Sequence, residues 1–252
     1  MKKYLGWHAA LVYAFLHLPL AILVAFSFNR SRYSVWEGFS LHWYRAMFQD
    51  GQMAEAAWNS IVIAVASSMI ATAIGTAAAY GMWKRKAVVL AGSLYLSLVT
   101  PEIVTGISLL ALFQWIFRWL PFRLGLVTVI IAHVAFSVAY VAIVISARLR
   151  EMEPGLEEAA QDLGATAWGA FQRVTLPLLA PAIGAAALLA LIVSFDDYVI
   201  TSLVAGVDSE TLPMVIYAMA RRGVNPVINA ASSAITVLFG VLILLSERVR
   251  AR

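Results

Sequence analysis

Runs of about 20 apolar residues recur along this chain, and each is long enough to cross the hydrocarbon core of a bilayer as a helix. The runs lie at 5–28, 58–83, 87–117, 124–147, 178–204 and 229–246. Hydrophobic residues make up 62% of the 252 residues and charged residues only 13%, which is more apolar surface than a soluble domain of this size can bury. We therefore predict an all-α integral membrane protein with six transmembrane helices, forming one domain over 1–252 and solvated by membrane lipid.

The first run begins after two basic residues, Lys2 and Lys3, as a signal peptide does. Its apolar stretch is too long for a signal peptide, and no small-x-small cleavage site ends it, so we interpret it as a retained helix. Lys and Arg number 11 on the side of the predicted bundle that carries both termini and 7 on the other side. Positive residues stay cytoplasmic, which predicts cytoplasmic N- and C-termini. The cluster Lys84-Arg85-Lys86 carries most of this inference.

The third run has 31 residues, so a straight helix would be about 46 Å long, well beyond the bilayer core. Pro101 lies near its middle, where a missing N–H and a ring clash bend a helix. A helix of this length must tilt, extend beyond the core or break, and we predict a bend around Thr100-Pro101-Glu102.

Small residues recur every four positions in the second run, at Ser67, Ala71, Gly75 and Ala79. They predict a helix face that another helix can approach closely. The alternative is that such spacing arises by composition in an alanine-rich chain.

Several function classes are disfavoured by composition. Cysteine is absent, which removes disulfides, thiolate nucleophiles and thiolate metal sites. His8, His17, His42 and His133 have no metal-ligand spacing, so interfacial or packed histidines are the better interpretation. The net charge of +4 comes from small basic groups between apolar runs, which do not form a nucleic-acid-binding stripe.

One cytoplasmic loop, 149–177, differs from the rest of the chain because it is rich in charge. Pro154 is predicted at the first position of a helix, with Glu157 and Glu158 in its first turn. Gly164 ends that helix, and a second short helix is predicted to run to Pro177. Trp168, Phe171 and Val174 lie on one side of the second helix, so the loop suits docking to a partner.

The loop also carries a recognisable spacing: Glu158-Ala159-Ala160, then Gly164, then Val174-Thr175-Leu176-Pro177. It resembles the EAA loop of binding-protein-dependent ABC permeases, with Val174 where isoleucine is usual. The resemblance implies a type I importer permease, in which this loop lies between helices 4 and 5 and fits a groove of the ATPase subunit. The coupling residues that it implies are Glu158, Ala159, Ala160, Gly164, Leu176 and Pro177.

A phosphate-binding loop is not expected in this chain, because such a loop needs a lysine after a glycine and no lysine follows Lys86. We predict a transport subunit that is not itself an enzyme and holds no cofactor. ATP and Mg²⁺ are then bound by a separate partner ATPase.

Three acidic residues lie within apolar runs: Glu102, Asp196 and Asp197. Acids inside a membrane are costly and usually face a water-filled path or a partner. In a continuous helix, Asp196 and Asp197 point about 100° apart, so one is predicted to line the path while the other bonds to backbone or a neighbouring helix. A purely structural contact is the alternative for any one of them. The set favours a cationic substrate, since no Lys or Arg lies in the runs as a partner for these acids.

Nearly the whole chain resembles the PotC-type subunits of spermidine/putrescine permeases, through Phe26 to Asn29, Leu41 to Phe48, Trp58-Asn59-Ser60, Thr100 to Phe113, Ser194 to Ile200 and Leu212 to Ala230. The resemblance implies that Glu102, Asp196 and Asp197 contact polyamine ammonium groups. Aromatic faces also hold cations, which makes Trp43 a candidate contact on the entry side, whereas Tyr44 is better interpreted as an interfacial aromatic.

The resulting prediction is a multi-pass permease in a bacterial inner membrane. It would assemble with a second homologous permease, two ATP-binding subunits and a periplasmic substrate-binding protein, and import polyamines. The alternatives are a permease for phosphonate, opine or ferric iron, an ion-coupled secondary transporter, and a membrane enzyme, for which no nucleophile elbow or metal cluster is visible.

Overall fold

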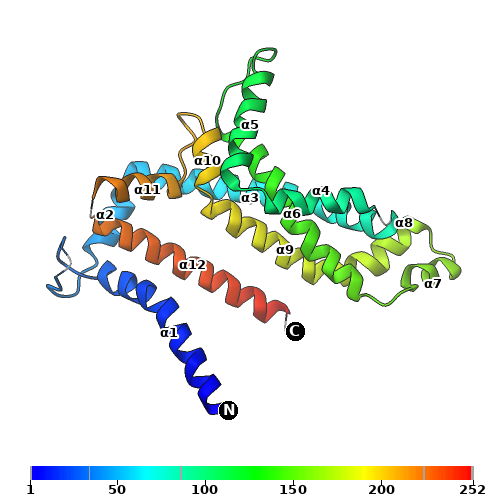
Figure 1. The fold of residues 1–252 in the computed structure, drawn as a ribbon, viewed down its shortest axis with the longest axis horizontal. Helices are drawn as coiled ribbons and strands as arrows, with labels where there is room; N and C mark the ends of the chain where they lie inside the picture. The colour runs from blue at the N-terminus through cyan, green and yellow to red at the C-terminus, as the bar shows by residue number, and fades with distance from the viewer. Residues whose placement is uncertain (1, 34, 86, 224, 251–252) are drawn as a thin grey trace. The chain divides into compact units, whose positions relative to one another are not determined.

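The computed structural model describes residues 2–33, 35–85, 87–223 and 225–250, and within these it confirms the all-α prediction (Figure 1). Lys86, from the basic cluster, lies outside the described residues. The helices are α1 Lys2–Ser27, α2 His42–Gln49, α3 Gly51–Arg85, α4 Val88–Val99, α5 Glu102–Ile116, α6 Leu126–Glu151, α7 Leu156–Asp162, α8 Ala167–Ala170, the π-turn η1 Phe171–Thr175, α9 Leu176–Asp196, α10 Val199–Val204, α11 Leu212–Arg222 and α12 Pro226–Arg250.

Among the described residues, five helices are long and apolar enough to cross a membrane, and the bent pair α4 and α5 brings the number to six if it counts as one span. The predicted bend at Pro101 is confirmed, but it is a break of 108° between two helices. Thr100 and Pro101 both have extended backbones, with ψ of 127° and 136°. Helical hydrogen bonding therefore stops at Thr100 and begins again at Glu102.

Two compact units make up the fold. The first contains the residues up to Ala57 together with Met214–Leu244, and the second contains Trp58–Pro213 together with the chain from Leu245 onward. The first unit holds α1, α2 and most of α12. That both units belong to one transmembrane domain over 1–252 stays a prediction.

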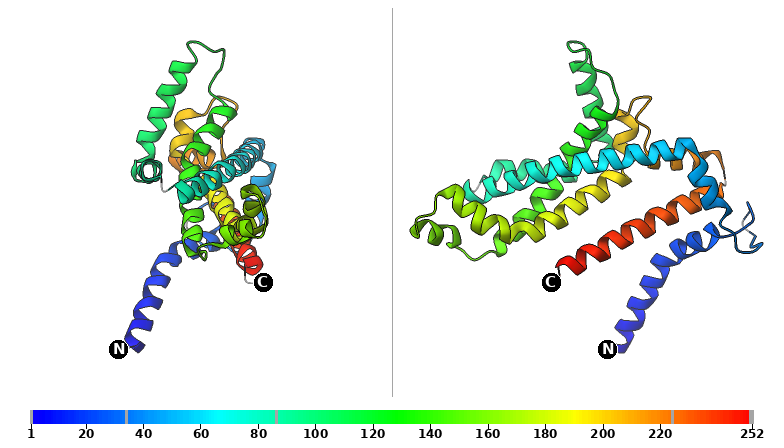
Figure 2. Two further views of the ribbon diagram at one scale, coloured as in Figure 1. Left: turned by 90° about the vertical axis from the view of Figure 1, so that its right-hand side faces the viewer. Right: turned by 180° about the vertical axis from the view of Figure 1, so that it is seen from behind.

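The core of the second unit forms where α3, α6 and α9 pack against one another, and the three helices run side by side in Figure 2. The small-residue face of α3 is confirmed there, because Ser67, Ala71 and Ala79 are fully buried. A Cβ on Gly75 would lie 2.7 Å from the Val141 Cβ, so only glycine allows α3 and α6 to approach this closely.

A second apolar cluster joins α5, α10 and the start of α6 through Phe113, Val129, Ile200 and Val204. Gly106 of α5 lies against α10, where an added Cβ would be 3.4 Å from the Ile200 Cα. This packing holds the N-terminal end of α5, and with it Glu102, near the junction of α9 and α10.

Candidate functional site

The junction between α9 and α10 differs from the predicted continuous helix over 178–204, and that prediction was wrong. α9 ends at Asp196, Asp197 is extended with φ −66° and ψ 126°, and α10 begins at Val199. The carboxylate of Asp197 accepts from the backbone N–H groups of Ile200 (3.4 Å) and Thr201 (2.8 Å). A carboxylate bonded to the first amides of a helix stabilises a new helix start, which explains the break.

Asp197 belongs to a buried polar network in which its side chain is only 5% exposed. Its Oδ2 accepts from the Thr201 hydroxyl at 2.7 Å and lies 3.4 Å from Nε2 of His133. The other ring nitrogen of His133 lies 2.6 Å from the Ser194 hydroxyl, which is 2.9 Å from the Ser67 hydroxyl. The network links α3, α6, α9 and α10, and these partners offset the cost of burying a carboxylate.

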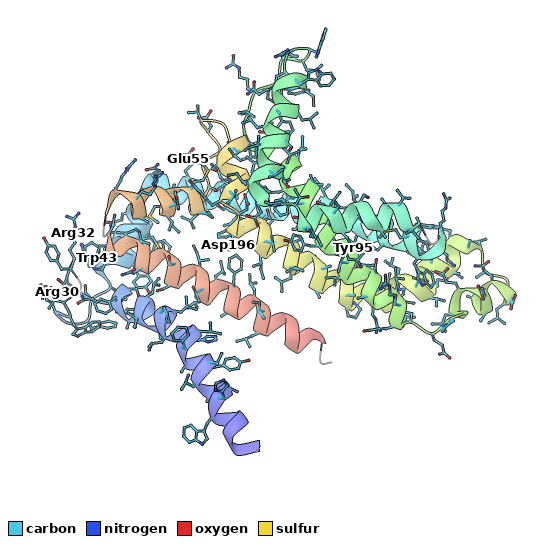
Figure 3. The ribbon with its side chains drawn as sticks, in the orientation of Figure 1. Arg30, Arg32, Trp43, Glu55, Tyr95 and Asp196 are labelled. Carbon is cyan, nitrogen blue, oxygen red and sulfur yellow. The ribbon has the colours of Figure 1, made fainter. Side chains whose placement is uncertain are left out.

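Asp196 and Glu102 lie in a different setting, since both side chains are exposed and neither makes a hydrogen bond or ion pair with another described residue. Both line a cavity of about 360 Å³ in the second unit, together with Asp197. Figure 3 labels Asp196 at the end of α9. The structure thus brings the three predicted acids to one cavity and gives Asp197 a set of protein partners that the other two lack.

Aromatic residues also line the cavity. They were not among the site residues predicted from the sequence. Phe136 and Tyr140 reach it from α6 and Tyr198 from the α9–α10 junction. Phe136 and Tyr140 pack edge to face, with ring centroids 6.5 Å apart. Their i, i+4 spacing in an apolar run, next to His133, was the signal available. Carboxylates and aromatic faces are both groups that attract organic cations.

Trp43 lies in the first unit, where it makes structural contacts. Its Nε1 donates to the backbone oxygen of Asn29 at 2.8 Å, and its ring packs edge-on against His42. The neighbouring Tyr44 hydroxyl lies 2.7 Å from that of Ser27. A role for Trp43 in substrate entry stays a prediction.

The predicted coupling loop contains two turn glycines. α7 begins at Leu156, two residues after the predicted start at Pro154, because Gly155 adopts a left-handed φ of +85° that cannot belong to a helix. Glu157 and Glu158 lie in the first turn, as predicted. Gly164, with φ of +92°, follows the end of α7, which confirms the prediction that Gly164 ends the first helix of the loop.

The second helix of the loop does not end at Pro177, and that prediction was wrong. α8, the π-turn η1 and α9 follow each other without a loop, giving 30 helical residues over Ala167–Asp196. The π-turn shifts the hydrogen-bonding register just before α9, so Pro177 lies in the first turn of α9, where a missing N–H costs little. The Thr166 hydroxyl caps the helix by accepting from the Gly169 N–H at 3.0 Å.

Glu157 is held by several polar side chains, whereas the family spacing begins at its neighbour Glu158. The Glu157 side chain is 4% exposed, with Oε2 2.5 Å from Nζ of Lys84. The Tyr80 hydroxyl donates to both carboxylate oxygens at 3.1 Å, and the Thr175 hydroxyl donates to Oε1. Burial raises the pKa of Glu157, but the hydrogen bonds from Lys84, Thr175 and Tyr80 and the charge of Lys84 outweigh it and lower the pKa.

The six predicted coupling residues lie at the surface of the loop and of the start of α9. Ala160 is partly exposed and the others are exposed: Glu158, Ala159, Gly164, Leu176 and Pro177. The carboxylate of Glu157 therefore holds the loop to the end of α3, while Glu158 faces outward.

Comparison with known proteins gives a consistent result. The family model described as "Binding-protein-dependent transport system inner membrane component" matches residues 71–252. The chain is 40% identical to the putrescine transport system permease protein PotI of Escherichia coli (strain K12), over 95% of this chain and 88% of that protein. It is 36% identical to the spermidine/putrescine transport system permease protein PotC of Haemophilus influenzae, over 94% of this chain and 93% of that protein.

Among solved structures, a chain of a bacterial ABC transporter that imports the acidic polysaccharide alginate aligns with a TM-score of 0.77. The alignment covers 98% of this chain and 94% of that chain at 18% identity. This likeness shows that the fold is that of an ABC importer permease.

Proposed function

Since this chain belongs to the family of binding-protein-dependent transport system inner membrane components, and is thus a multi-pass permease subunit, we propose that its cargo is a polyamine of the putrescine or spermidine kind. The proposal is supported by relatives whose names specify these two substrates, each matched over more than nine-tenths of this chain.

One observation carries the proposal: Glu102 and Asp196, two carboxylates without a polar partner among the described residues, line one cavity with aromatic residues. A linear diamine carries separated ammonium groups joined by an apolar chain. Separated carboxylates can pair with the ammonium groups and aromatic faces can cover the chain between them. An anionic cargo such as a phosphonate would be repelled by the same carboxylates.

The partners follow from the family and from the exposed loop. We propose that a second, homologous permease completes the path, that two ATP-binding subunits bind and hydrolyse ATP with Mg²⁺, and that a periplasmic protein delivers the substrate. Glu158, Ala159, Ala160, Gly164, Leu176 and Pro177 form the surface that docks to an ATPase. This assignment is supported by the exposure of most of these residues and by the Lys84–Glu157 ion pair, which holds the loop to the end of α3.

The orientation proposed is cytoplasmic for both termini and for the coupling loop. It is supported by the Lys84–Glu157 ion pair, which joins the basic end of α3 to the loop. ATP binding would close the two motor subunits and move the coupling loops. The cavity would then turn from the cytoplasm toward the loaded binding protein, and return as hydrolysis resets the complex.

The test is ATP-dependent uptake of labelled putrescine and spermidine into vesicles containing the assembled transporter. Glu102→Gln and Asp196→Asn are expected to lower uptake by about tenfold or more while basal ATPase activity is retained, because each removes a charge-assisted contact. Ser97→Ala is the matched control, since Ser97 lines the same cavity without a charge.

Three results would overturn parts of this proposal. Absence of polyamine uptake in native vesicles, with uptake of a phosphonate, an opine or ferric iron, would replace the cargo. Uptake driven by a proton gradient without any ATPase would indicate a secondary transporter. Equal uptake by the native chain and both acid variants would remove the acids from the path.

A further inference from the structure

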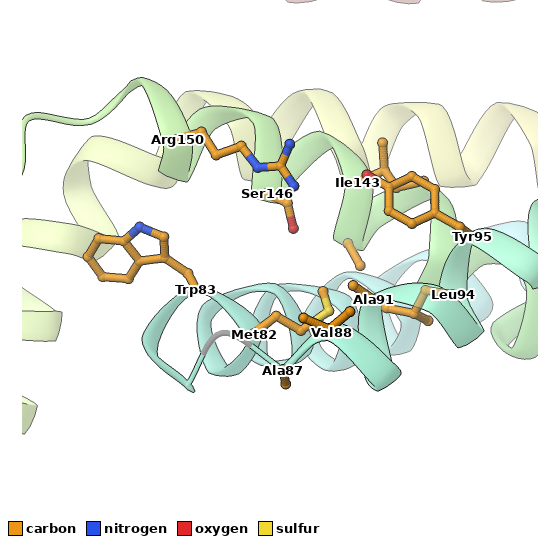
Figure 4. A pocket seen from close by; sticks show the side chains of 11 residues that line it. Met82, Trp83, Ala87, Val88, Ala91, Leu94, Tyr95, Ile143, Ser146 and Arg150 are labelled. Carbon is orange, nitrogen blue, oxygen red and sulfur yellow. The ribbon is translucent and has the colours of Figure 1, made fainter.

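A second cavity, of about 400 Å³, lies within the second unit between the end of α3, α4 and the end of α6 (Figure 4). It is separate from the acidic cavity and shares no lining residue with it. Among its lining residues there is one cation, Arg150, and no acid.

One end of this cavity is polar. Arg150 and Ser146 are four residues apart on α6 and thus lie on the same helix face, and Trp83 of α3 lies opposite Arg150 (Figure 4). Arg150 makes no ion pair or hydrogen bond with the part of the chain that the structure describes. Arg148, in the same turn, contrasts with it because it pairs with Glu151 at 3.4 Å and donates to the backbone oxygen of Leu178.

The other end is apolar. Ala91, Leu94 and Tyr95 of α4 line it with Ile143 of α6 (Figure 4). Seven residues separate Arg150 from Ile143, so the two ends are about 10 Å apart along α6.

The position of the cavity specifies the kind of ligand. Arg150 lies in the last turn of α6, next to the cytoplasmic loop, and Trp83 precedes Lys84 and Arg85 at the end of α3. Tryptophan and basic residues at the end of a spanning helix lie at the depth of lipid headgroups. A guanidinium binds a phosphate through two parallel hydrogen bonds, and basic pockets between helices on the cytoplasmic side accept anionic headgroups.

We propose that this cavity binds an anionic phospholipid of the cytoplasmic leaflet. Arg150 and Ser146 hold its phosphate, and one acyl chain lies between α4 and α6 on Ala91, Leu94 and Ile143. The site rests on the membrane orientation proposed above and is independent of the cargo. It also accounts for the exposed apolar face of α4, which includes Val88 at 79% exposure.

Native mass spectrometry of the assembled transporter, titrated with phosphatidylglycerol or phosphatidylcholine, tests the proposal. We expect the native chain and Arg148→Gln to bind phosphatidylglycerol alike, and Arg150→Gln to bind it about tenfold more weakly. Arg150→Lys should recover part of the binding, and Ala91→Phe, which fills the apolar end, should weaken it. Unchanged assembly of the four variants confirms that they fold.

Four outcomes would overturn the site. Equal binding to Arg150→Gln and native chain would remove Arg150 from it. Equal binding of the two lipids would remove headgroup selection, and displacement by millimolar inorganic phosphate would indicate a free anion. A disulfide between the cysteine introduced by Ala91→Cys and a single cysteine on the second permease would show that a protein helix occupies the groove. The native chain has no cysteine that could form a competing disulfide.

Discussion

Lys84 and Glu157 join the end of α3 to the first turn of α7, with the Lys84 Nζ 2.5 Å from Glu157 Oε2. The two residues are 73 positions apart in the sequence, and their contact is the point at which a membrane-spanning helix holds the coupling loop. The lysine side chain is 39% exposed and the carboxylate 4%. This asymmetry decides which partner is more costly to lose.

Removing Lys84 should destabilise the loop more than removing Glu157. Lys84→Met leaves a buried carboxylate without its cation, whereas Glu157→Gln leaves a lysine that can reach water. We expect a loss of about 1–3 kcal/mol for Lys84→Met and a smaller loss for Glu157→Gln, measured by thermal unfolding of the assembled transporter. Both should lower uptake per ATP hydrolysed. Glu151→Gln, from an exposed pair with Arg148, is the control and should be nearly neutral; a larger effect there would refute this account.

The contribution of Glu157 should depend on pH in one direction. Its pKa in the folded protein is lowered, while an unfolded glutamate titrates near about 4.3. Its stabilisation is therefore complete above the unfolded pKa and is lost as the pH falls through the lower folded pKa. The difference in melting temperature between native chain and Glu157→Gln should shrink below about pH 4. A difference that grows on acidification would contradict this sign.

Substitutions of Asp196 and Asp197 should have different effects, on uptake for Asp196 and on stability for Asp197. Asp197→Leu removes the carboxylate that accepts from the backbone N–H and the hydroxyl of Thr201 and that lies against Nε2 of His133, and should cost about 1–3 kcal/mol of stability. Asp196→Asn removes no contact with the described residues, so the melting temperature should hold while the KM for polyamine uptake rises. Thermal unfolding and initial uptake rates, measured on the same preparations, check both. A stability loss confined to Asp196→Asn would reverse the assignment.

Of the two α3 residues Gly75 and Gly81, only Gly75 should be required for stability. Gly75→Ala places a methyl group 2.7 Å from the Val141 Cβ and 3.0 Å from the Val138 backbone oxygen, so α3 and α6 must separate. We expect a destabilisation of about 1–3 kcal/mol from this overpacking. Gly81→Ala, with nothing within 4 Å of the new Cβ, should be neutral or slightly stabilising. Equal melting temperatures for the two variants would show that the helices separate without cost.

Much of this architecture could be predicted from the sequence because it depends on local chemistry. Apolar length predicted the spans, Pro101 the break between α4 and α5, and Gly164 the turn after α7. The break after Asp196 could not be predicted, because it depends on a carboxylate bonded to the next helix and to His133, 64 positions away. Pro177 misled for a related reason: proline ends a helix unless it lies in a first turn, and a π-turn created that first turn.

The acidic site was predicted in part. Charge in an apolar run identified Glu102, Asp196 and Asp197, but their different surroundings come from tertiary contacts. Phe136 and Tyr140 were hidden among the many aromatic and aliphatic residues of their span. Glu157 was hidden by its neighbour, since the recognised spacing begins one residue later, at Glu158.

The uninterrupted helical stretch Ala167–Asp196 carries the exposed Trp168 near one end and the cavity carboxylate at the other, about 45 Å away. Because no loop separates the two, we expect a shift or rotation at Trp168 to move Asp196 as well, less any part that bending at the π-turn Phe171–Thr175 or at Pro181 absorbs. Under the proposed function, thermodynamic reciprocity applies: the factor by which nucleotide binding to the ATPase changes cation affinity at Asp196 equals the factor by which a bound cation changes nucleotide affinity. This helical segment would thereby make the nucleotide and the transported cation effectors of each other.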